Sequence, residues 1–257
     1  DSIYEIITEY KDDNTFEKKL IDNVCLKIEN YIKLLMPDST VIIAFDGVAP
    51  IAKLEQQRSR RYRSHFIENV TMQINPEKVK IPWDKTAITP GTSFMNKLNY
   101  NVKKYFEINN EKYNCKEIII SGSDLAGEGE HKIFEYIRQN KERHEKQKTV
   151  IHGLDADLIM LCLNHLHISE NIHLYRETPH FIKNISSDLD PKETYIININ
   201  ELADNIVEDL KPDKKYTKKE KLEIIHDYIF VCLFLGNDFM PHFPSINIRT
   251  KGINILL

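Results

Sequence analysis

Four apolar segments of the chain each end close to one or two acidic side chains. These segments cover residues 40–45, 116–121, 149–152 and 219–235. The acids that follow them are Asp46, Glu128, Glu130, Asp155, Asp157 and Asp238. Carboxylates that converge on one point repel one another unless protons or cations neutralise them. If the segments meet at one edge of the fold, this set of acids predicts a cation site.

The spacing of two acidic pairs restricts where they can act. Glu128 and Glu130, like Asp155 and Asp157, are two positions apart. Such side chains diverge by about 200° on an α-helix but point the same way in an extended segment, so each pair can act together only just before a helix begins. Oxygen-only ligands favour Mg²⁺ or Mn²⁺. This many acids indicates two ions about 4 Å apart, which can activate water and stabilise a leaving oxygen in phosphodiester hydrolysis.

Each acid taken alone is better explained as a helix N-cap or a surface charge, so the hypothesis depends on the whole set.

A basic segment lies shortly after the first of these acids. Residues 52–64 read AKLEQQRSRRYRS, with a single acid among five cations. Lys53, Gln57, Arg60 and Arg61 are spaced i, i+4, i+7 and i+8, which places them on one stripe of a helix. Arginine binds phosphate oxygens bidentately, so the stripe suits a terminal phosphate. The alternative is a solvated charged face.

Helices and strands that could position these residues alternate along the chain. Hydrophobic periodicity predicts helices over 16–36, from 52, and over 92–106, 129–140, 157–166 and 219–235. Short β-branched runs predict strands over 40–45, 116–121, 149–152, 172–175 and 195–199. The expected fold class is therefore α/β, with a largely parallel central sheet and helices on both faces. Sites in such sheets lie outside the carboxyl ends of the strands, where the acids are.

Composition is that of an ordinary globular protein. Hydrophobic residues make up 41% and charged residues 29% of the 257 residues, which argues against disorder. The formal charge of −4 excludes a wholly basic nucleic-acid binder but permits local basic patches beside an acidic metal site. No apolar run is long enough to span a membrane. The four cysteines form no C-x-x-C motif, which favours free thiols in a reducing interior, cytoplasmic or nuclear.

Five strings in the chain carry a resemblance to a known family. They are FDGVAPIAKLEQQRSRRYRS (45–64), PGTSFM (90–95), SGSDLAGEGEHKI (121–133), GLDADLIML (153–161) and FLGNDFMPHFPS (234–245). In this order they resemble the N-terminal nuclease segment of the 5′→3′ exoribonuclease (XRN) family. The resemblance implies a PIN/FEN-like nuclease fold over 1–257 as one domain. It also implies hydrolysis of single-stranded RNA from a 5′-monophosphate end to mononucleotides, with two Mg²⁺ ions that Mn²⁺ can replace.

The resemblance also assigns roles to the candidate residues. It implies that the six acids named above bind the metal ions and that Lys53, Gln57, Arg60 and Arg61 hold the 5′-phosphate. For His131 the roles of surface or core histidine and of substrate or second-shell contact remain open. Trp83 is expected to pack in the interior rather than to stack on a base.

Two departures from the family pattern concern the ends of the chain. The family opens with a strand that ends in another metal-binding aspartate, whereas this chain opens with DSIYEII. The family's catalytic module also continues beyond Leu257 into helical elements. We therefore expect the chain to be a fragment, with poor or no activity from residues 1–257 alone.

Two other function classes stay open. One is a structure-specific flap endonuclease that acts on DNA junctions, which shares the logic of a carboxylate metal cluster. The other is a catalytically weak RNA-binding scaffold, against which the retained acids argue. The preference for RNA over DNA comes only from the resemblance. No membrane association is predicted, and the sequence does not identify protein partners.

Overall fold

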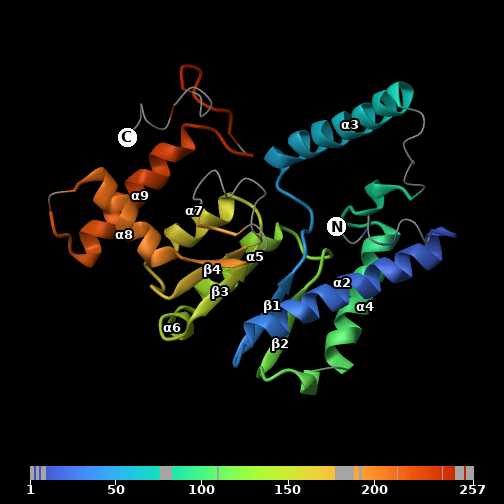
Figure 1. The fold of residues 1–257 in the computed structure, drawn as a ribbon, viewed down its shortest axis with the longest axis horizontal. Helices are drawn as coiled ribbons and strands as arrows, with labels where there is room; N and C mark the ends of the chain where they lie inside the picture. Colours follow the sequence, from blue (N-terminus) through green and yellow to red (C-terminus); the bar gives the residue numbers. More distant parts are fainter. Residues whose placement is uncertain are drawn as a thin grey trace. The chain divides into compact units, whose positions relative to one another are not determined.

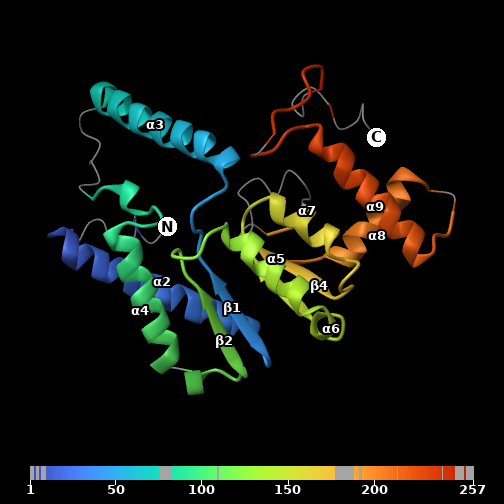
Figure 2. The same cartoon turned by 180° about the vertical axis from the view of Figure 1, so that it is seen from behind.

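The computed structural model describes residues 3, 6, 10–75, 83–108, 110–176, 188–190, 193–212, 214–238, 240–246 and 252 (Figures 1 and 2). The chain divides into two compact units, 1–133 and 134–257. Along the described part of the chain, no helix combines the length and the apolar character that crossing a membrane requires.

The first unit is built on a pair of parallel strands. In chain order it contains α2 (Asp13–Leu35), β1 (Thr40–Ala44), α3 (Ile51–Ile74), the short 3₁₀ helix η2 (Lys85–Ala87), α4 (Ser93–Ile108), a second 3₁₀ helix η3 (Asn110–Lys112) and β2 (Glu117–Ser121). β1 pairs with β2 in parallel, from Thr40 opposite Glu117 to Ala44 opposite Ser121. Helix α5 (Gly129–Gln139) begins in this unit and ends in the next.

Helices α2 and α4 bury the apolar core of the first unit. Helix α2 begins at the N-cap Asp12, whose carboxylate accepts a hydrogen bond from the Thr15 amide, as expected of a capping aspartate. Its buried face includes Phe16, and the ring of Trp83 lies 5.5 Å from Phe16 and 5.1 Å from Phe94. Trp83 is only 4% exposed, so the predicted packing role is confirmed.

Helix α3 differs from α2 and α4 because none of its residues is buried within the described part of the chain. Apolar side chains such as Ile51, Tyr62 and Phe66 are exposed on it. The polar stripe therefore lies on a helix that does not contribute to the core.

The second unit contains a three-stranded sheet with helices beside it. Its elements are α6 (Lys141–His144), β3 (Thr149–His152), α7 (Asp157–Asn164), β4 (Ile172–Arg176), β5 (Tyr195–Asn198), α8 (Ile199–Leu210) and α9 (Lys218–Leu233). β3 pairs with β4 in parallel, and β4 pairs with β5 antiparallel. The fully buried side chains of this unit include Phe134, Leu163, Ile172, Leu174 and Ile225.

The predicted α/β class with parallel strand pairs is confirmed, and the strand positions agree to within a residue or two. The expectation of one sheet differs from the structure, in whose described residues the strands form two sheets, β1–β2 and β3–β4–β5. The antiparallel β5 also departs from a parallel arrangement. Two neighbouring strands that run parallel need a crossover connection, which is usually a helix. The sequence pattern predicts no helix between 172–175 and 195–199, so it does not specify whether β5 runs parallel or antiparallel to β4.

Candidate metal centre

The carboxyl ends of β1 and β2 are held together beyond the strands themselves. The amide of Phe45 donates to the carbonyl of Ser121 at 2.9 Å. Further along, the amide of Gly47 donates to the carbonyl of Gly127 at 2.8 Å. The amide of Gly127 donates in turn to the carbonyl of Val48 at 3.0 Å. The turn after β1 and the loop after β2 are therefore bonded to each other, which fixes the acids that follow each strand.

Asp46 is positioned by the first residue of α5. Its Oδ1 accepts a hydrogen bond of 2.7 Å from the amide of Gly129. A Cβ atom on Gly129 would lie 2.9 Å from the carbonyl oxygen of Ala44 and 3.3 Å from Oδ1 of Asp46, so only glycine allows this close approach. A carboxylate at a helix N-terminus is also favoured by the helix dipole.

Glu128 is the most buried acid of the candidate set in the first unit. It is 4% exposed. Its Oε2 forms an ion pair of 2.7 Å with Nζ of Lys53 at the start of α3. Its Oε1 is buried and has no hydrogen-bond partner among the described residues. An unpartnered buried carboxylate oxygen is costly, so it indicates a missing partner such as an ion or a water.

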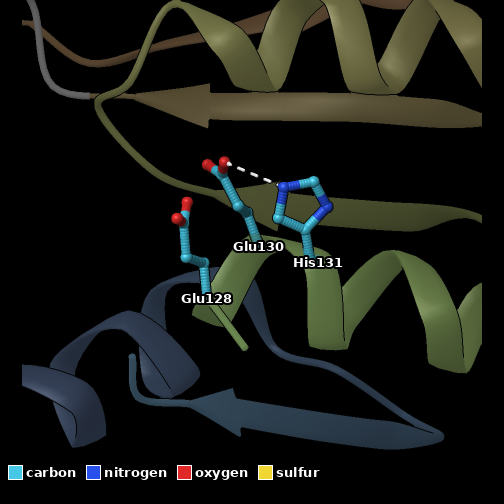
Figure 3. Close-up of side chains that lie close together, drawn as sticks. All are labelled: Glu128, Glu130 and His131. Carbon is cyan, nitrogen blue, oxygen red and sulfur yellow. Dashed lines mark ion pairs between the residues drawn. The ribbon is translucent and has the colours of Figure 1, made fainter. Parts of the chain in front are cut away.

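Glu130 and His131 complete a group with Glu128 at the start of α5, shown in Figure 3. One ligand atom from each of the three side chains lies within 4.8 Å of the others. Nε2 of His131 lies 3.9 Å from Oε1 of Glu130. Glu128 immediately precedes α5 and Glu130 is its second residue, which is where the i, i+2 spacing allows a pair of acids to converge.

This group fits a divalent cation by its chemistry. It offers two carboxylates and one imidazole, and one of the carboxylate oxygens is buried without a partner. Glu128, Glu130 and His131 would hold the ion, with Asp46 bonded to the same helix start. The structure therefore agrees with a metal-binding acidic cluster, and His131 joins it although its role was left open by the sequence.

The polar stripe on α3 is only partly connected to this cluster. Lys53 is the member that pairs with a cluster carboxylate, and its side chain is 14% exposed. Arg60 and Arg61 lie further along the same helix and are exposed. The predicted helix is present, whereas the binding of a phosphate by Lys53, Gln57, Arg60 and Arg61 stays a prediction.

The remaining candidate acids belong to the second unit. Asp155 lies in the exposed loop after β3, and Asp157 is the first residue of α7. Asp238 follows the turn after α9, where Gly236 adopts a φ of 85° and its hydrogen atom faces the backbone of His242. These three acids are outside the group of Figure 3. Their joining with Asp46, Glu128 and Glu130 in one centre stays a prediction.

Lys132 is a residue of this region that the sequence patterns alone did not indicate. Its Nζ donates to the carbonyl oxygens of Phe45 and Gly122, each at 2.8 Å. Desolvation lowers the pKa of its ammonium group, while the charges of Asp124 and Asp46 act in the opposite direction. Its position directly after GEGEH was the only signal in the sequence.

The fold and this cluster define an α/β protein with a carboxylate site of the kind that holds divalent cations. A family model described as XRN 5'-3' exonuclease N-terminus matches residues 3–178. A second model, described as Xrn1 helical domain, matches residues 218–257. The chain therefore belongs to the XRN 5'-3' exonuclease family. That residues 1–257 form a single nuclease domain stays a prediction.

Curated relatives agree with this membership. The chain is similar to 5'-3' exoribonuclease 1 of Saccharomyces cerevisiae, with 32% identity over 256 residues that cover 94% of the chain and 17% of the relative. With 5'-3' exoribonuclease 1 of Schizosaccharomyces pombe the chain is 32% identical over 270 residues, which cover 97% of the chain and 20% of the relative. With 5'-3' exoribonuclease 2 of Arabidopsis thaliana it is 30% identical over 281 residues, which cover 90% of the chain and 28% of the relative. The chain thus spans less than a third of the length of each of these relatives.

Proposed function

We propose that the chain forms the metal-binding part of a 5′→3′ exoribonuclease that releases mononucleotides from 5′-monophosphorylated single-stranded RNA. The single observation that carries the proposal is the buried Oε1 of Glu128, which has no hydrogen-bond partner among the described residues. Glu128 lies in one group with Glu130 and His131. Family membership and the names of the relatives support the reaction class.

The proposed metal ligands are the six acids named from the sequence: Asp46, Glu128, Glu130, Asp155, Asp157 and Asp238. Two Mg²⁺ ions, or Mn²⁺ in their place, would polarise the scissile phosphate and lower the pKa of an attacking water. The Gly129 amide fixes Asp46, and Lys53 neutralises the charge on one oxygen of Glu128.

The proposed 5′-phosphate site is the polar stripe on α3. Lys53 lies beside the acidic cluster, so a phosphate held by Lys53, Gln57, Arg60 and Arg61 would place the next phosphodiester near the cations. Charge-assisted and bidentate bonds to a terminal phosphate favour a monophosphate end. A capped or duplex end would not fit the same contacts.

The thiols support a reducing compartment, in agreement with the proposed cytoplasmic or nuclear location. The four cysteines are free, and burial raises the pKa of the Cys25 thiol to about 11 and that of Cys162 to about 12. Such thiols are protonated at neutral pH and inert.

Site-directed variants in the complete polypeptide that carries this chain test the proposal. Asp155→Ala and Asp157→Ala are each expected to abolish cleavage of 5′-monophosphorylated RNA while the far-ultraviolet circular dichroism stays unchanged. Retained cleavage in either variant would refute the metal assignment. A product gel separates the alternatives, because an exonuclease releases mononucleotides and a flap endonuclease releases an intact flap.

A second variant tests the phosphate site separately. Arg60→Ala is expected to reduce cleavage of monophosphorylated ends more than cleavage of hydroxyl ends, because it removes a bidentate phosphate contact. Arg143, whose guanidinium donates to the Tyr136 hydroxyl in the second unit, provides a control, Arg143→Ala, that should leave this preference unchanged. An equal loss on all ends in Arg60→Ala would place the phosphate site elsewhere.

A further inference from the structure

Lys132 contacts all three segments from which the acids of the first unit project. Its Nζ donates at 2.8 Å to the carbonyl of Phe45, directly before Asp46, and at 2.8 Å to the carbonyl of Gly122, just after β2. Its own amide donates to the carbonyl of Glu128 at 3.1 Å. One side chain on α5 therefore joins the ends of both strands to the start of the helix that carries Glu128.

The partners of this ammonium group are unusual for a lysine beside acids. The two hydrogen bonds of Nζ go to neutral backbone carbonyls, although Asp46 and Asp124 lie near enough to oppose the desolvation that lowers the pKa of the ammonium group. A lysine that served only to neutralise the acids would gain more from a direct ion pair, since charge-assisted bonds to carboxylates are the stronger ones. The carbonyl contacts therefore indicate a role in fixing the backbone.

We propose that Lys132 is a positioning residue that ties the ends of β1 and β2 and so sets the separation between Asp46 and the acids at the start of α5. Residues that orient metal ligands through hydrogen bonds typically change metal affinity 10–100-fold when they are removed. This inference rests on the proposed function in one respect, namely that these acids bind a divalent cation.

The sign of the effect on metal affinity distinguishes positioning from simple electrostatics. Removing a positive charge beside a cation site strengthens cation binding, because a like charge is lost. Removing a positioning contact weakens cation binding, because the ligands are no longer held together. Lys132→Met removes both the charge and the two carbonyl bonds while keeping an unbranched side chain of similar length.

Lys103 supplies a matched control on α4. Its Nζ lies 4.0 Å from Oδ2 of Asp124, and its side chain is 45% exposed. Lys103→Met thus removes a positive charge near the same acid without removing a bond to a strand end. If Lys132 acts by charge alone, Mn²⁺ affinity should change in the same direction in both variants.

The experiment measures Mn²⁺ affinity by calorimetry, together with amide hydrogen exchange at Gly47 and Gly129. For Lys132→Met we expect the Mn²⁺ dissociation constant to rise about tenfold or more and both amides to exchange at least about tenfold faster. Lys103→Met should leave amide exchange unchanged and Mn²⁺ binding equal or slightly tighter. If Lys132→Met does not fold, Lys132→Gln, which loses the charge but keeps an amide donor group, should show the same directions with smaller changes.

The outcomes separate this inference from the proposed function. Failure of the unaltered protein to bind Mn²⁺ at the cluster would refute the proposed function. Mn²⁺ binding that is unchanged or tighter in the Lys132 variant, with unchanged exchange at Gly47 and Gly129, would refute the positioning role alone.

Discussion

Gly47 lies where the turn after β1 touches the loop after β2, and Gly47→Ala should separate the two. A Cβ atom there would lie 1.7 Å from the carbonyl oxygen of Leu125. Contacts of real Cβ atoms do not fall below 3.0 Å, so the loops must move apart by about 1.3 Å, the difference between the two distances. That displacement stretches the bonds that link Gly47 and Val48 to Gly127.

The magnitude follows from these two hydrogen bonds. Leaving a backbone group unsatisfied costs about 1–3 kcal/mol, so the loss of both bonds in Gly47→Ala should lower the free energy of unfolding by about 2–6 kcal/mol in urea titration. A misplacement of about 1 Å at a catalytic site costs about 100-fold, so cleavage by the complete polypeptide should fall by about that factor.

Gly91→Ala is the control for this substitution. A Cβ atom on Gly91 would meet nothing within 4 Å, and its φ of 89° causes only backbone strain. It should cost about 1–3 kcal/mol of stability with the cleavage rate unchanged. If Gly47→Ala keeps the stability and the cleavage rate of the unaltered protein, the account of the joined loops is wrong.

Three further predictions concern other contacts. Lys53→Met should tighten Mn²⁺ binding, measured by calorimetry, because Glu128 loses a competing cation; weaker binding would contradict this. Lys33 lowers the pKa of the buried Glu29 below its usual 4.5, so this carboxylate stabilises the fold at neutral pH and the stabilisation is lost as pH falls through the lowered pKa; in Glu29→Gln the unfolding free energy should decline less steeply below pH 4.5. Thr217→Ala removes the capping box of α9 and should cost about 1 kcal/mol in urea titration, against no loss if the cap is dispensable.

Local patterns in the sequence predict much of the fold. Periodicity locates α2, α5 and α9, and β-branched runs locate β1 and β3, because these signals depend on neighbours within a few residues. The division into two sheets and the direction of β5 depend on contacts between distant segments. Nothing in the local pattern of residues 195–199 specifies which neighbour that strand joins.

In the candidate site, too, local spacing was predictable from the sequence whereas contacts between distant residues were not. The spacing of Glu128 and Glu130 relative to a helix start was sufficient to predict that they converge, and the structure brings them together. The ion pair of Lys53 with Glu128 joins residues 75 positions apart, and the bonds of Lys132 join α5 to two strand ends. Both depend on tertiary packing, so the sequence alone identified the acids and Lys53 but not the contacts that join them.

The central proposal is that the group of Glu128, Glu130 and His131 holds a divalent cation, and anomalous diffraction from crystals soaked in Mn²⁺ tests it most directly. We expect a peak about 2.1 Å from a carboxylate oxygen of Glu128, whose Oε1 is buried without a partner among the described residues. The absence of any peak at Glu128 would contradict the account.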